Sequence, residues 1–304
     1  MYNLFVNDLT VLDCAIWDYQ RGPIGMSWSV DVEFLGGLDD DGVVFDFSHA
    51  KKVAKSVIDN LADHKLITPY NLVNFDMTEN NIEYDFISME DPYPIMYRAP
   101  REAFCILKNC SKTGLIAYLE YKILDKIDKD NVYEVRVTLK DESDINNVYS
   151  YTHGLKTHYG NCQRLLHGHQ SSVRVFVNSK RREDIEKDIC DYFYDKHIVY
   201  KQNLISDKQE KSIDEFHNRI GIKYKSSQGE FSLKIPKSKV IVFENYETTV
   251  ECISEYIANW ISKNYKDTNS KTIEVHAYEG IGKGSKYILN PRVQKNIDKK
   301  LLNG

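Results

Sequence analysis

Two segments of the same design lie about half a chain length apart, and this internal repeat is the feature that most limits how the chain can fold. Residues 24–34 and 167–177 each begin with a glycine between two larger residues and continue with alternating apolar and polar positions. Such alternation is typical of a strand with one buried face. A period near half of 304 residues is most simply explained by duplication, so we expect two related units.

The composition is ordinary for a globular protein. With 304 residues, 42% of them hydrophobic, the chain can form one large core or two medium cores. The net charge is −5 and the 40 basic residues are spread along the chain, which argues against nucleic acid as a partner. We find no apolar run long enough to span a membrane and no signal-like N-terminus. Six scattered cysteines without a CxxC pair favour reduced thiols and a cytoplasmic location.

Periodicity and turn signals predict the elements of each half. They indicate that strands and helices follow the order strand, strand, helix, helix, strand, strand, with Asp46 or Ser48 capping the first helix. The expected elements are strands at about 2–12 and 28–36, a helix at 47–62, an irregular stretch to about 98, a helix at 101–124, strands at 131–140, 146–153 and 172–178, a mobile polar region at 206–230, a helix at 248–264, and strands at 271–279 and 285–289.

The second repeat carries a pattern suited to binding a metal. His167 and His169 are two residues apart on an expected strand, so both side chains point to the same face. His153, at the end of the preceding expected strand, offers a third nitrogen, and His158 is its possible substitute. Three neutral imidazoles with one open position are typical of catalytic zinc, although chance proximity is an even alternative for the histidines alone. The first repeat has Ile24 and Met26 at the two histidine positions, so its metal site is lost.

A thiol and an Asp-His pair are the other candidates for chemistry. Cys162 lies five residues before His167 and could act as a nucleophile or base. Asp63 and His64 follow the first expected helix. A histidine at a helix C-terminus also offsets the helix dipole, and that simpler reading is favoured for the pair taken alone.

Together these pieces resemble the 6-pyruvoyl- and 6-carboxytetrahydropterin synthase family. The resemblance rests on the segments 152–153, 162–169, 39–47 leading into 62–66, and 278–287. It implies an α+β chain of two tandem tunnelling-fold (T-fold) units, each an antiparallel sheet with helices packed on one face. Residues 1–146 would form the unit that keeps Asp-His but lacks the metal ligands. Residues 147–304 would form the unit with the zinc site and the cysteine, and Asp195-Lys196-His197 would be a broken counterpart of Asp-His.

The resemblance also implies roles for single residues. His153, His167 and His169 would hold Zn²⁺, Cys162 would be the general base, and Asp63 with His64 would handle a second proton. Glu279 would anchor the pterin ring. Thr249 and Glu251 would open a helix, line the pterin pocket, or do both.

The expected function is therefore that of a zinc-dependent lyase. By resemblance it converts 7,8-dihydroneopterin triphosphate to 6-carboxy-5,6,7,8-tetrahydropterin, as in 7-deazaguanine or queuosine synthesis. The alternatives are a 6-pyruvoyltetrahydropterin synthase and a non-catalytic pterin-binding protein. A sibling nitrile reductase is disfavoured because it does not need the histidines. The expected partners are the pterin triphosphate and further copies of the chain that close a barrel. The family's usual hexamer of single units would correspond to three copies of this tandem chain.

Overall fold

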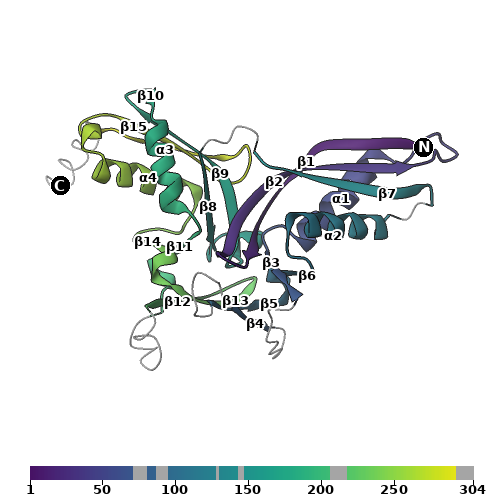
Figure 1. The fold of residues 1–304 in the computed structure, drawn as a ribbon, viewed down its shortest axis with the longest axis horizontal. Coiled ribbons are helices and arrows are strands. Elements are labelled where there is room, and N and C mark those ends of the chain that lie inside the picture. Colours follow the sequence, from purple (N-terminus) through teal and green to yellow (C-terminus); the bar gives the residue numbers. More distant parts are fainter. Residues whose placement is uncertain (71–80, 87–94, 128–129, 143–146, 206–217, 292–304) are drawn as a thin grey trace.

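The computed structural model describes residues 1–70, 81–86, 95–127, 130–142, 147–205 and 218–291. Within these residues the chain forms three β-sheets, and helices lie against the two larger ones (Figure 1). This confirms the predicted α+β class and the tandem T-fold plan. In the described residues there is no helix with the length and apolar character needed to cross a membrane.

The first sheet comes from the first half of the chain. A long antiparallel hairpin forms its centre, a third antiparallel strand lies on one side, and two short parallel strands lie on the other. The sheet order is β6-β3-β1-β2-β7. Its elements are β1 (Tyr2–Asp18), β2 (Gly22–Gly36), α1 (Phe47–Leu61), β3 (Leu66–Pro69), β6 (Phe104–Leu107), α2 (Lys112–Asp125) and β7 (Val132–Lys140).

The second sheet repeats this plan in the second half. Its order is β14-β11-β8-β9-β15-β16, with parallel pairing again confined to the two strands beyond the hairpin. Two strands are added to the order of the first sheet: β16 beyond β15, and a short strand beside β9. Its elements are β8 (Val148–His153), β9 (His167–Val177), the short β10 (Lys180–Arg181) beside β9, α3 (Glu183–Phe193), β11 (Lys196–Tyr200), β14 (Val240–Phe243), α4 (Val250–Asn264), β15 (Ile273–Tyr278) and β16 (Gly284–Leu289).

A third sheet joins the two halves. Each half inserts one hairpin between its two short parallel strands, and the two hairpins pair edge to edge through β5 and β13. The strands are β4 (Asn81–Phe86), β5 (Ile95–Pro100), β12 (Arg219–Ser226) and β13 (Gly229–Pro236). Apolar residues of both halves form one core beneath this sheet, among them Trp17, Tyr97 and Leu165. The halves therefore share a core and do not fold as separate bodies.

Helix boundaries follow local capping. Asp46 caps α1, because its side chain accepts a hydrogen bond from the backbone N–H of His49 at 2.9 Å. Ser111 caps α2 by accepting from the N–H of Gly114 at 3.1 Å. The helix predicted at 101–124 was therefore wrong over its first eleven residues. Residues 104–107 instead form the buried strand β6, which pairs with β3 from a distant part of the chain.

Two further predictions need correction. The predicted order of elements was wrong, because the strands β3 and β6 stand between the two helices of the first half, as do β11 and β14 in the second. The region 206–230 was expected to be mobile; residues 206–217 lie outside the described part, but residues 219–226 form β12. The predicted boundary between residues 146 and 147 adjoins the undescribed residues 143–146 and stays a prediction.

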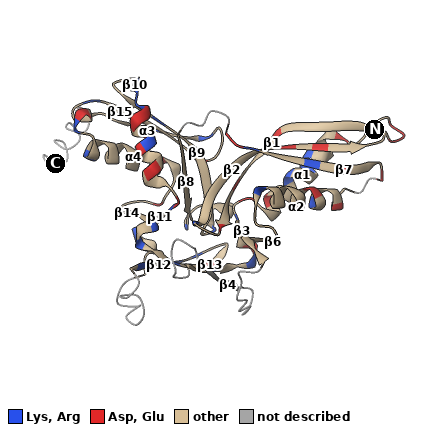
Figure 2. Ribbon diagram, in the orientation of Figure 1, with Lys and Arg blue, Asp and Glu red and all other residues tan. Residues whose placement is uncertain are grey.

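Charged residues of both signs are mixed over the described ribbon. Figure 2 shows Lys and Arg beside Asp and Glu on helices of both halves, with α1 and α3 each carrying both signs. Lys and Arg are thus not confined to one half of the chain, which agrees with the spread of basic residues in the sequence.

The two large hairpins touch at equivalent glycines of the repeat. A Cβ added to Gly168 would lie 2.5 Å from the Cα of Gly25, and a Cβ added to Gly25 would lie 2.1 Å from the carbonyl oxygen of Tyr151. These are contacts with backbone, which cannot move aside as a flexible side chain can. A contact between equivalent positions is what a two-fold relation between the units produces.

We predict that Gly25→Ala destabilises the chain by at least about 3 kcal/mol, the upper range for overpacking, because the new methyl group would overlap backbone atoms of β8 and β9. Urea unfolding measures this. Gly37→Ala is the matched control, since its Cβ would meet only the hydroxyl of Tyr133 at 3.1 Å. Equal stability of the two variants would contradict the close packing of the hairpins.

Candidate functional site

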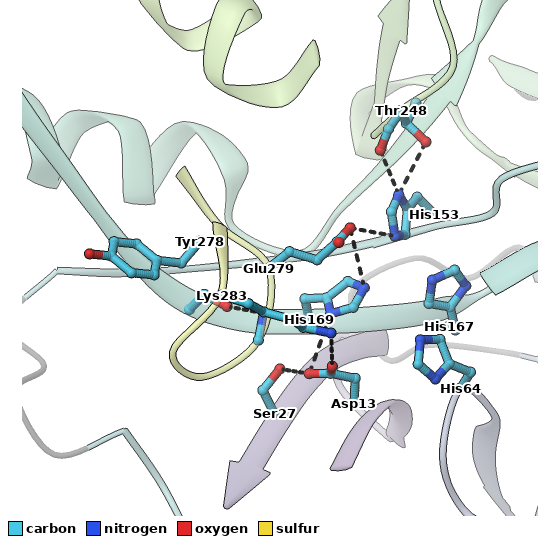
Figure 3. A network of polar contacts seen from close by, with 12 residues as sticks. Asp13, Ser27, His64, His153, His167, His169, Thr248, Tyr278, Glu279 and Lys283 are labelled. Atoms are coloured by element: carbon cyan, nitrogen blue, oxygen red, sulfur yellow. Dashed lines mark hydrogen bonds and ion pairs between the residues drawn. The ribbon is translucent and has the colours of Figure 1, made fainter. Parts of the chain in front are cut away.

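Three histidines converge where β8 and β9 meet (Figure 3). His153 and His167 are opposite each other in the antiparallel register, and His169 lies two pairs further along on the same face. All three are at most 1% exposed. Their ring centroids are 4.5 to 5.3 Å apart, and one nitrogen from each lies within 4.8 Å of the others. The three rings could hold one metal ion.

In His153 and His167, the ring nitrogen Nδ1 faces a hydrogen-bond acceptor. Nδ1 of His153 lies 3.0 Å from the carbonyl oxygen of Thr248, and Nδ1 of His167 lies 2.7 Å from that of Arg164. A carbonyl only accepts, so both Nδ1 atoms must carry the hydrogen and both Nε2 atoms must carry a lone pair. These Nε2 atoms are buried without a hydrogen-bond partner. Unpaired lone pairs aimed at one place fit a bound cation.

Burial also keeps two of the ligand candidates neutral. Desolvation lowers the pKa of His153 and His167 well below 6.5, and the neighbouring histidines lower the pKa further. Neutral imidazole is the form that binds a metal. Glu279, at the end of β15, places Oε1 3.8 Å from Nε2 of both His153 and His169. The predicted pterin anchor therefore lies beside two of the three histidines.

The Asp-His pair comes from the first half and reaches the same place. His64 follows α1 in the left-handed conformation, with φ of 53°. Its Nδ1 lies 2.6 Å from Oδ2 of Asp63, and its ring centroid is 5.0 Å from that of His167. Ligand atoms of His64, Cys162 and His167 lie within 4.8 Å of one another. The site is therefore assembled within one chain, from both halves.

His64 is charged at neutral pH. Burial lowers its pKa, but the hydrogen bonds to Asp63 and Cys162 and the charges on both groups outweigh burial and raise the pKa to about 10. The group formed by His64, Cys162 and His167 could also hold a metal on distance alone. A protonated imidazole does not coordinate, so the three buried histidines are the better ligand set.

Two cations close in sequence to these groups are also buried. Lys65 follows His64 and is 7% exposed, while Arg164 stands two residues after Cys162 and is 8% exposed. Burial and, after it, the nearby positive charge of Arg164 lower the pKa of Lys65 to about 8. Nη1 of Arg164 is buried without a hydrogen-bond partner. Positive charge held in this way favours an anionic ligand close by.

Thr249 and Glu251 lie at the start of α4 but outside this cluster. Thr249 occupies the N-cap position without a side-chain hydrogen bond to the helix, and Glu251 is exposed in the first turn. The neighbouring Thr248 makes the contact with His153. Sequence reasoning missed Thr248 and also Asp13, because neither belongs to a local pattern.

The first repeat retains the geometry of the site without its chemistry. Matching Gly25 to Gly168 in the strand registers puts Ile16, Ile24 and Met26 in place of the three histidines. The residue in place of His64 is Asp195, which follows α3 with the same φ of 53°.

The prediction that Asp195-Lys196-His197 is a broken Asp-His element was wrong in its alignment. Tyr194 and Asp195 occupy the places of Asp63 and His64, and His197 is a core residue of β11. Arg21 contacts Tyr194 and Asp195. It forms an ion pair with Asp195 at 3.5 Å and donates a hydrogen bond to the Tyr194 hydroxyl at 2.6 Å. The shorter hairpin turn of the first repeat supplies this arginine where the second repeat has the Cys162 loop.

A groove on the surface of the first half lies apart from this site. It has a volume of about 870 Å³ and runs between α1 and α2, lined by residues such as His49, Lys52 and Tyr118. None of its lining residues belongs to the histidine cluster.

Taken together, the fold and the cluster define a tandem α+β protein with a metal-type histidine site beside a thiol and a charged histidine. The chain belongs to the 6-pyruvoyl tetrahydropterin synthase family, whose model matches residues 25–142 and again residues 142–290. The double match agrees with the two units in the fold. Membership supports a pterin-processing lyase.

Among solved structures the chain is similar to 6-pyruvoyltetrahydropterin synthases of two malaria parasites. A catalytic-residue mutant from Plasmodium vivax is 21% identical, with a TM-score of 0.37, over 46% of this chain and 90% of that chain. The Plasmodium falciparum enzyme is 22% identical, with a TM-score of 0.37, over 45% and 90%. No curated protein matches this chain.

We predict that the charged state of His64 makes stability depend on pH. Its pKa is about 10 when folded and about 6.5 when unfolded, so the folded chain holds a proton that the unfolded chain releases between these values. The resulting stabilisation is complete below pH 6.5 and is lost as the pH rises towards 10, by up to about 1.4 kcal/mol per pH unit.

Urea unfolding of the metal-free chain and of His64→Gln at several pH values tests this prediction. The difference in unfolding free energy between the two should shrink steadily above pH 6.5. A difference that does not change with pH would contradict a charged His64.

Proposed function

We propose that this chain is a zinc-dependent pterin synthase that converts 7,8-dihydroneopterin triphosphate to 6-carboxy-5,6,7,8-tetrahydropterin. The observation that carries the proposal is the meeting of three buried histidines, a thiol and a charged Asp-His pair in one place. His153, His167 and His169 would hold the zinc through Nε2. Bound there, the ion would polarise oxygen atoms of the substrate side chain and make the adjacent C–H groups more acidic.

The protein's own groups account for proton transfer. Cys162 is the proposed base, and His64, which lies beside it, is the proposed second proton-transfer group. Asp63 holds His64 in place through Nδ1, which leaves Nε2 of His64 to face the thiol and the substrate. One group can thus take a proton from carbon while the other returns one to an adjacent atom.

Binding groups surround this centre. Glu279 is the proposed partner of the guanidine-like edge of the pterin, and its nearness to two histidines would place the ring beside the metal. Thr249 and Glu251 stay candidates for the pterin pocket. Lys65 and Arg164, buried cations in the segments that carry His64 and Cys162, are proposed to attract a substrate that carries a triphosphate.

The 6-pyruvoyl product is the second candidate. It is favoured by the name of the family whose model matches, and the same zinc, thiol and Asp-His groups serve triphosphate elimination. The two reactions differ in whether the substrate side chain is cleaved, so product analysis separates them.

We predict that the purified chain with zinc turns over 7,8-dihydroneopterin triphosphate to a 6-carboxy pterin and acetaldehyde, as measured by mass spectrometry. A chelator should abolish turnover. Cys162→Ala should lower kcat at least about 100-fold, the usual contribution of a general base, while the variant keeps about one zinc per chain.

Each other outcome has its own meaning. A 6-pyruvoyl product would move the assignment to the second candidate. Zinc binding without turnover would favour the hypothesis of a non-catalytic pterin-binding protein. A wild-type chain that binds no zinc would refute the proposed metal centre.

We further propose that the chain forms homo-oligomers by joining the outer strands of its two large sheets. β7 and β16 each have one edge that pairs with no other described strand, and each exposes a large apolar residue, Tyr133 and Ile288. The mass in solution, measured by light scattering, is expected to be a multiple of 35.4 kDa, and Ile288→Asp should reduce it. A monomeric wild-type chain would refute barrel closure.

A further inference from the structure

Asp13 is a buried carboxylate of the first half that lies against the histidine cluster of the second half (Figure 3). It is 1% exposed. Oδ1 of Asp13 lies 3.4 Å from Nδ1 of His169. His153 and His167 face neutral carbonyl oxygens at the corresponding nitrogen, so His169 differs from them in facing a charged acceptor.

Two further side chains fix the orientation of this carboxylate. The hydroxyl of Ser27 donates to Oδ1 at 2.5 Å, and Nζ of Lys283 lies 3.0 Å from Oδ2. Burial alone would raise the pKa of Asp13, but His169, Lys283 and Ser27 together bring it well below its usual value. The group is therefore an ionised carboxylate with little freedom to turn.

The backbone of Asp13 connects to the Asp-His pair. Its N–H donates to Oδ1 of Asp63 at 3.1 Å, and its carbonyl accepts from the N–H of His64 at 2.6 Å. One residue of β1 thus contacts a candidate metal ligand through its side chain and the proposed proton-transfer pair through its backbone.

The position equivalent to Asp13 in the second half is not a carboxylate. In the first half, Ala15 pairs with Gly25, and Asp13 lies two residues before Ala15. In the second half, Thr152 pairs with Gly168, and Ser150 lies two residues before Thr152. Ser150 is therefore the equivalent residue of the second half. Its hydroxyl donates to the carbonyl of Gly25 at 2.9 Å. The carboxylate stands only in the copy that faces the histidines.

We propose that Asp13 is a positioning residue for the metal centre. Its negative charge beside Nδ1 of His169 would favour the hydrogen on that nitrogen, which leaves Nε2 of His169 with the lone pair and makes it a stronger donor to a cation. The inference rests on the zinc site proposed above and adds that the unit without metal ligands supports the site in the other unit.

Metal affinity of the apo chain tests this role without any assay of turnover. Competition with a chromophoric zinc chelator should show binding about ten- to a hundredfold weaker in Asp13→Asn than in the wild type. Asp8→Asn is the matched control. Asp8 is an exposed carboxylate on the same strand, paired with Lys140 at 2.7 Å, and its loss should leave zinc affinity unchanged.

Spectroscopy separates positioning from simple stabilisation. In ¹⁵N NMR of the wild-type apo chain, His169 should be protonated on Nδ1, and that signal should change in Asp13→Asn. Asp13→Ser, which installs the residue found at the equivalent place, should reproduce the loss of affinity if the Asn variant does not fold.

The outcomes distinguish the two proposals. A wild-type chain without zinc affinity overturns the metal centre and this inference with it. A wild-type chain that binds zinc, together with equal affinity in the Asp13 variants, overturns this inference alone. So does a wild-type His169 that carries its hydrogen on Nε2, which needs no variant to fold.

Discussion

The contact between Gly25 and Gly168 sets the distance between the two halves, and the rest of the site depends on it. At this point two strands meet without side chains between them, so backbone from one repeat lies directly against backbone from the other. Any larger residue would push the hairpins apart. With the hairpins this close, His64 from one half comes within ring contact of His167 from the other.

Duplication explains why one site can draw on two units. A chain that carries both copies can change one copy without losing the other, so the ligand positions became Ile16, Ile24 and Met26 in the first half. The first half in turn supplies Asp63, His64 and Asp13. The inserted hairpins add a shared sheet and a shared core, so the two halves stay packed together when residues of one half are substituted.

The sequence was sufficient to predict the parts of the site that follow a local pattern. Strand alternation placed His167 and His169 on one face, and the repeat indicated that residues 24–26 had lost the same function. The short strands β3 and β6 escaped prediction because four residues carry too little periodicity. Asp13 and Thr248 escaped because their importance comes only from contacts with residues more than 90 positions away.

The pairing of Arg21 with Asp195 has a consequence for the metal-free chain. At the other junction, the place of Asp195 is taken by His64, which carries its own positive charge beside Asp63. In the first repeat a side chain of the protein supplies the positive charge permanently. The junction between the halves therefore has one support that does not depend on metal supply. The two halves are thus held together at this place whether or not the histidine cluster binds an ion.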